Sequence, residues 1–134
     1  MSHAPQPLRV VALWAPPLVW MALIFVGSSL DAGDKPGLLD FPHADKLMHL
    51  VEYGVLGFLL ARILGRGESA PSTAVLIASA LITLAYGVTD EVHQIWVPTR
   101  TFSLCDLTAD LIGGALGAAA WLWVAARPWR PRWW

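Results

Sequence analysis

No charged residue occurs between Val10 and Leu30. An uncharged run of this length is typical of a membrane-spanning helix, because about 20 helical residues cross the hydrocarbon core of a bilayer. Three further apolar stretches of similar length follow, at residues 46–64, 72–96 and 104–126. The sequence therefore predicts four membrane-spanning helices.

Composition agrees with a membrane protein. Hydrophobic residues make up 56% of the chain and charged residues 14%, whereas a soluble domain usually carries about 25% charged residues. The segments between the apolar stretches are short, and Pro98 lies where the third helix has to stop. We expect an all-α fold, an antiparallel four-helix transmembrane bundle that forms one domain over residues 1–134, with spans at about 10–30, 46–64, 72–96 and 104–126.

Charge and cysteine content exclude two other features. The formal net charge of -1 gives no reason to expect nucleic acid as a partner. The single cysteine, Cys105, excludes a disulfide within the chain. The predicted localisation is the inner, or cytoplasmic, cell membrane as a multi-pass protein, with the lipid bilayer as a partner. A homo-oligomer is left open.

Basic residues predict the orientation of the bundle. Four spans place both termini on one side of the membrane, and six of the basic residues flank that side. They are Arg9, Arg62, Arg66, Arg127, Arg130 and Arg132. Lys35, Lys46 and Arg100 lie opposite. Because cytoplasmic loops carry an excess of Lys and Arg, we expect both termini to be inside, N-in and C-in.

Ionisable residues interrupt the apolar stretches in three places, at residues 45–53, 86–94 and 106–110. A charged group in hydrocarbon costs about 2.5 kcal/mol or more on insertion scales. These places are the start of the second helix, the end of the third and the start of the fourth, so an antiparallel bundle brings them to the same face. The sequence therefore predicts one shared polar pocket, on the extracytoplasmic side.

Helical phase supports this convergence. At about 100° per residue, the polar residues of each helix fall within one arc. The arcs contain Asp45, His49, Glu52 and Tyr53; Thr83, Tyr86, Asp90, His93 and Gln94; and Asp106, Asp110, Gly113 and Gly117. Gly113-x-x-x-Gly117 is a small-residue motif that permits close helix packing, so we expect this face of the fourth helix to touch another helix.

The motifs resemble those of the VanZ-like family of small integral membrane proteins. They are Asp45-Lys46-x-x-His49-x-x-Glu52-Tyr53, Thr89-Asp90-Glu91-x-His93-Gln94, Pro98-Thr99-Arg100-Thr101-Phe102-Ser103-x-x-Asp106 and Asp110-x-x-Gly113-x-x-x-Gly117. The named member of the family is associated with resistance to the glycopeptide antibiotic teicoplanin. The resemblance therefore implies a cell-envelope role but no particular reaction. The family often has Gly at the position of Thr99 and Asn at that of Asp110.

The candidate site residues fall into two groups. The candidate catalytic residues are His49, His93 and Asp90, with either histidine as general acid or base and Asp90 as its orienting carboxylate. The candidate binding residues are Asp45, Lys46, Glu52, Tyr53, Glu91, Gln94, Arg100, Asp106 and Asp110. In this interpretation Arg100 and Lys46 hold an anionic group of the ligand.

A divalent metal is an alternative occupant, and its candidate ligands are His49, Glu52, Asp90 and His93. Two histidines with carboxylates suit zinc or another first-row metal, whereas a carboxylate-rich set suits magnesium or manganese. No pair of histidines at positions i and i+4 supports a known metal motif.

The other interpretation is an internal network of ion pairs that fixes helix packing. Arg100 would then bridge to Asp106 or Asp90, Lys46 would pair with Glu52 or Asp45, and Glu91 would face interfacial water.

Three classes of function and a structural alternative follow. The protein could be an enzyme acting on a lipid-linked or envelope substrate at the outer leaflet, or a non-catalytic binder of a lipid headgroup, peptide or antibiotic. A small cation- or proton-coupled transporter and a membrane scaffold are the alternatives. We favour binding of, or chemistry on, an envelope ligand, and the residues do not decide whether turnover occurs.

Overall fold

The computed structural model describes residues 7–30, 42–66 and 72–127. This part of the chain forms four helices and no strand: α1 (Pro7–Ser28), α2 (Ala44–Leu64), α3 (Ser72–Gln94) and α4 (Leu104–Ala125). Each helix is long and apolar enough to cross a membrane. The prediction of an all-α fold with four such helices is confirmed, while the direction in which they cross the membrane stays a prediction.

The end of α3 and the start of α4 are fixed by local chemistry. α3 ends at Gln94, two residues before the predicted end, because a residue that precedes proline avoids helical backbone angles and Val97 precedes Pro98. The Val97 N–H donates to the Gln94 carbonyl (3.0 Å), which closes the last turn. α4 begins after Ser103, whose side chain accepts a hydrogen bond from the Asp106 N–H.

Glycines bring α2 and α4 into backbone contact. Gly54 and Gly57 of α2 face Gly113, Gly114 and Gly117 of α4, and we call these five residues the glycine interface. A Cβ atom added at Gly117 would overlap the Gly54 carbonyl, and one added at Gly57 would overlap the Gly114 backbone. The predicted close packing at Gly113 and Gly117 is confirmed, and its partner is a matching glycine face on α2.

α3 packs against the same side of α4. Thr83 lies against Gly114, and Gly87 leaves room for the carboxylate of Asp110. At the far end of the bundle these three helices share an apolar cluster of Ala61, Val75, Ala118 and Trp121. α2, α3 and α4 therefore form one tightly packed unit, with the polar residues at the other end.

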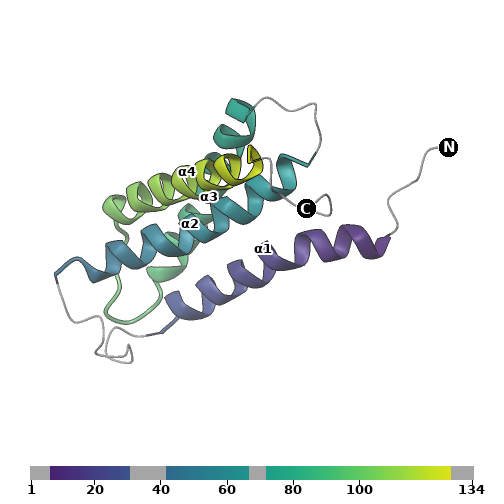
Figure 1. Cartoon of the computed structure of the whole chain (residues 1–134). Helices are drawn as coiled ribbons and strands as arrows, with labels where there is room; N and C mark the ends of the chain where they lie inside the picture. The colour runs from purple at the N-terminus through teal and green to yellow at the C-terminus, as the bar shows by residue number, and fades with distance from the viewer. Residues whose placement is uncertain (1–6, 31–41, 67–71, 128–134) are drawn as a thin grey trace.

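α1 lies beside α2, which separates it from α4 (Figure 1). Ile24 of α1 packs with Tyr53, Leu56 and Leu60 of α2, and Trp20 and Met21 border that cluster. Two of the long-range hydrogen bonds that hold α1 in place come from aromatic side chains. They join Trp20 Nε1 to the Glu52 carbonyl (2.8 Å) and the Tyr86 hydroxyl to the Met21 carbonyl (2.6 Å).

Candidate polar site at one end of the bundle

Two side-chain pairs join α2 to α4, one helical turn apart. His49 Nδ1 lies 2.8 Å from Asp110 Oδ1, and both side chains are buried. Lys46 Nζ donates to Asp106 Oδ1 (3.1 Å) and to Asp45 Oδ2 (2.8 Å). The glycine interface lets the axes of α2 and α4 approach closely, and this brings the paired side chains within hydrogen-bond distance.

Glu91 enters the same region from α3. Its side chain is fully buried, with 0% exposure, and Oε2 accepts a hydrogen bond from the Ser103 N–H (2.6 Å). The interpretation that Glu91 faces interfacial water is therefore wrong. α3 has neighbours on two sides, so Asp90 can turn toward α1 while the adjacent Glu91 turns toward the other helices.

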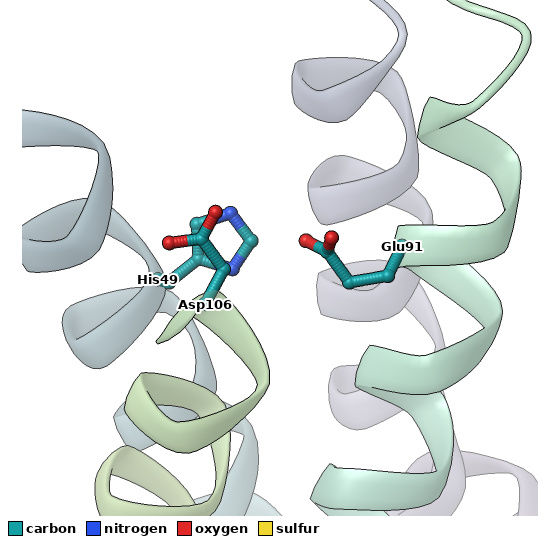
Figure 2. Close-up of side chains that lie close together, drawn as sticks. All are labelled: His49, Glu91 and Asp106. Atoms are coloured by element: carbon teal, nitrogen blue, oxygen red, sulfur yellow. The ribbon is translucent and has the colours of Figure 1, made fainter. Parts of the chain in front are cut away.

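The Glu91 side chain points from α3 toward His49 and Asp106 (Figure 2). Each of these three residues offers a ligand atom, and the three atoms lie within 4.8 Å of one another. We call them the His49–Glu91–Asp106 cluster. Among the residues that the structure describes, this is the group of His, Cys, Asp and Glu side chains gathered closely enough to hold an ion. The predicted metal set shares only His49 with it.

A second group of contacts joins α3 to α1. Asp90 accepts hydrogen bonds from the Ser28 hydroxyl and from Gln94 Nε2 (3.1 Å). His93 Nε2 lies 3.0 Å from the Ser29 hydroxyl, and its ring packs on Phe25 with centroids 4.4 Å apart. His93 and Asp90 thus contact α1 rather than Asp106 and Asp110.

Sequence reasoning missed Ser28 and Ser29. The sequence does contain a sign of their role. Two adjacent hydroxyl residues stand at the end of the uncharged run, where they can form hydrogen bonds with polar residues at the same end of the bundle. The predicted pairing of His49 with Asp90 also differs from the structure, in which Asp110 is the carboxylate beside His49.

A small cavity lies between the two groups of contacts. Its lining residues are Gly27, Ser28, Met48, His49, Glu52, Asp90, Gln94 and Arg100. The cavity volume is about 20 Å³, which is room for a water molecule. Four of the predicted site residues in α2 and α3, together with Arg100 from the α3–α4 connection, thus border one space.

Two buried polar atoms have no hydrogen-bond partner within the described ranges. They are the Nε of Arg100, a residue of the cavity wall, and the hydroxyl of Tyr53, a residue that packs beside His49. Tyr53 is fully buried, and its ring is parallel to that of His49 with centroids 5.9 Å apart. Because buried polar atoms are nearly always hydrogen-bonded, such atoms indicate places where a water molecule or ligand can bind.

One family model matches most of the chain. Its description is VanZ/LLP1, and the match covers residues 12–125. The matched range includes all four helices except the first residues of α1. No curated protein and no solved structure gives a significant match.

Proposed function

This chain belongs to the VanZ/LLP1 family and is a multi-pass membrane protein, and from that premise we propose that it binds a lipid-linked ligand of the cell envelope through its headgroup. The observation that carries the proposal is the cavity between α1, α2 and α3, with ionisable residues in its wall. Ionisable side chains within a membrane mark functional sites by default, since they are costly to keep there.

The cavity wall offers both hydrogen-bond donors and acceptors. Arg100 is a permanent cation and suits a phosphate group, and Gln94 supplies an amide. Glu52 and Asp90 are acceptors that suit hydroxyl or amino groups. A sugar or amino sugar attached to a phosphate combines these features, and its lipid tail would stay in the bilayer.

Entry of a headgroup requires one wall to move, because the cavity has room for little more than a water molecule. α1 is the wall that can move at the lowest cost. It has no glycine contact with another helix, and much of its surface faces outward, including Val11, Leu18 and Val19, each more than half exposed. Displacement of α1 would open the cavity directly to lipid.

Acid–base chemistry is the second candidate function, and one observation favours it. His49 lines the cavity while its Nδ1 is held by Asp110. A carboxylate in that place fixes the orientation and tautomer of the imidazole, as a general base requires. If turnover occurs, we expect His49 with Asp110 to transfer the proton, in preference to His93 with Asp90.

Binding can be tested with a polyprenyl phosphate as the probe and the uncharged polyprenol as its control. The purified protein in detergent is titrated with each lipid, and occupancy is read by native mass spectrometry. We expect the phosphate to bind more tightly. Arg100→Gln should weaken its binding about 10-fold or more, because a hydrogen bond to a charged group contributes about 1.5–3 kcal/mol. Arg127→Gln is the matched control, since Arg127 lies over Trp123 at the other end of α4.

Equal binding of the two lipids, or equal weakening by both arginine variants, would show that the headgroup is not recognised in the cavity. A scaffold role predicts a different result: neither lipid binds, and Arg100→Gln only lowers the melting temperature.

The side of the membrane on which the site lies can be tested with the natural cysteine. Cys105 is exposed and precedes Asp106. In intact cells, a membrane-impermeant maleimide should label Cys105 if both termini are inside. In the Cys105→Ser background, Arg66→Cys should be labelled only after the membrane is permeabilised. The opposite pattern would place the site in the cytoplasm and remove the envelope argument.

A further inference from the structure

We propose that His49, Glu91 and Asp106 bind one first-row divalent metal ion, of which Zn²⁺ is the best fit. The site is separate from the headgroup interaction proposed above and shares only His49 with the cavity. With the ion bound, His49 Nε2 is a metal ligand and does not act as the general base of the second candidate function. It replaces the metal set expected from the sequence, because the structure gathers a different trio of ligand atoms.

The three residues come from three different helices and converge on one point. Their ligand atoms lie within 4.8 Å of one another, and all three side chains are buried. Figure 2 shows the Glu91 carboxylate directed from α3 toward His49 and Asp106. Ligands around zinc stand about 2.0–2.2 Å from the ion, so a small closing movement of these side chains completes the site.

Glu91 gives evidence for a ligand that is independent of this proximity. Oε2 is held by the Ser103 N–H (2.6 Å), whereas Oε1 is buried and has no hydrogen-bond partner in the described part of the chain. A buried oxygen without a partner is costly. An ion bound to Oε1 removes that cost, and the bond from Ser103 keeps the carboxylate directed toward it.

His49 is already arranged as a metal ligand. When Nδ1 donates to Asp110 Oδ1 across 2.8 Å, Nε2 keeps its lone pair for an ion. Metal-binding histidines almost always donate their other ring N–H to a carboxylate or carbonyl in this way. Asp110 is therefore a positioning residue in this site and not one of the ligands.

The charge balance also favours a cation. Glu91, Asp106 and Asp110 bring three carboxylates to one buried region, and Lys46 is the cation paired with Asp106. Lys46 contacts Oδ1 of Asp106, which leaves the other oxygen of that carboxylate for the ion. A divalent ion offsets carboxylate charges that are otherwise expensive to bury together.

The ligand set indicates the class of metal. One imidazole and two carboxylates suit zinc, and the same donors bind manganese less tightly. Three protein ligands leave a coordination position open, as in catalytic zinc sites. An ion here would stand next to the cavity because His49 borders both.

The experiment measures Zn²⁺ bound to the full-length protein after treatment with chelator and dialysis against a known Zn²⁺ concentration. Elemental analysis gives the stoichiometry, and the Zn²⁺-induced rise in melting temperature gives a second readout. We expect a single equivalent of Zn²⁺ in the wild type. Glu91→Gln and His49→Gln should each weaken binding 10-fold or more, and Asp110→Asn should weaken it 10–100-fold through the loss of ligand orientation.

His93→Gln is the matched control, since His93 contacts α1. It should keep full Zn²⁺ binding. The proposal is overturned if the wild type binds no stoichiometric Zn²⁺, or if Glu91→Gln, folded as judged by melting in chelator, binds as well as the wild type. Loss in His93→Gln equal to that in His49→Gln would contradict it too. Repeating the polyprenyl phosphate titration in chelator separates the two proposals. If the phosphate still binds without metal, the proposed headgroup binding stands even when the proposed Zn²⁺ site fails.

Discussion

The glycine interface and the contact between α1 and the rest of the bundle hold helices together in opposite ways. Across the glycine interface, backbones touch, and a single added methyl group would overlap a carbonyl. Along α1, the contact rests on larger side chains such as Ile24 and Trp20 and on a few hydrogen bonds, and a Cβ added at Gly27 would meet nothing within 4 Å.

The two sides of the polar end therefore differ in how firmly their side chains are held. The α2–α4 side holds His49 on Asp110 and Lys46 on Asp106 in fixed geometry. The α1 side supplies Ser28 to the wall of the cavity. This arrangement suits binding of a lipid headgroup. α1 can move away to admit the headgroup, while the side chains that α2 and α4 hold in place keep their geometry.

The largest effect is expected when the rigid side loses one partner of its buried pair. His49→Ala leaves the Asp110 carboxylate buried without its partner and should lower the free energy of unfolding by about 3–5 kcal/mol. Asp110→Asn should be neutral or stabilising, because it removes the buried charge and keeps an oxygen that accepts from Nδ1. Unfolding by SDS in mixed micelles, with chelator present, measures both. Equal losses in the two variants would contradict this account of the pair.

The next largest effect is expected when the same substitution, glycine to alanine, is made in the glycine interface and in α1. Gly117→Ala places a methyl group against the Gly54 carbonyl and should cost about 1–3 kcal/mol. Gly27→Ala has open space and should stabilise by up to about 1 kcal/mol, because alanine is the better helix former. The same SDS titration applies. If the two variants behave alike, the helices do not pack as closely as the glycine interface requires.

A smaller effect is expected from loosening α1 alone. Tyr86→Phe removes the hydrogen bond to the Met21 carbonyl and should cost about 0.5–1.5 kcal/mol. Hydrogen exchange should rise in α1 and stay unchanged around Gly113 in α4. A uniform rise over all four helices would show that α1 is not an independently opening wall.

The smallest effect is expected at Thr99, whose φ of 66° lies in the left-handed region. A β-branched residue is strained there. Thr99→Gly should change stability by less than about 1 kcal/mol, in the stabilising direction, because relief of strain exceeds the entropy cost of glycine. His43→Gly is the control, since His43 has the same φ but histidine tolerates it better. A clear destabilisation by Thr99→Gly would mean that the threonine side chain, not the backbone, matters at this turn.

Local patterns were enough to predict much of this protein. Hydropathy and length gave the four helices, because a bilayer requires long apolar segments. Gly113-x-x-x-Gly117 predicted a contact face, because small residues allow backbones to approach. The position of charged residues along each helix predicted a polar end, since antiparallel connection alone brings the start of α2, the end of α3 and the start of α4 together.

The tertiary structure alone decided which polar groups became partners. His49 meets Asp110 and not Asp90, Glu91 turns inward, and Ser28 reaches Asp90. Each outcome depends on how one helix is rotated about its axis relative to another. The periodicity of residues within one helix does not contain that rotation. That rotation is set at the glycine interface and by the place of α1, in which the uncharged run that starts at Val10 carries no charged residue from which its packing could have been predicted.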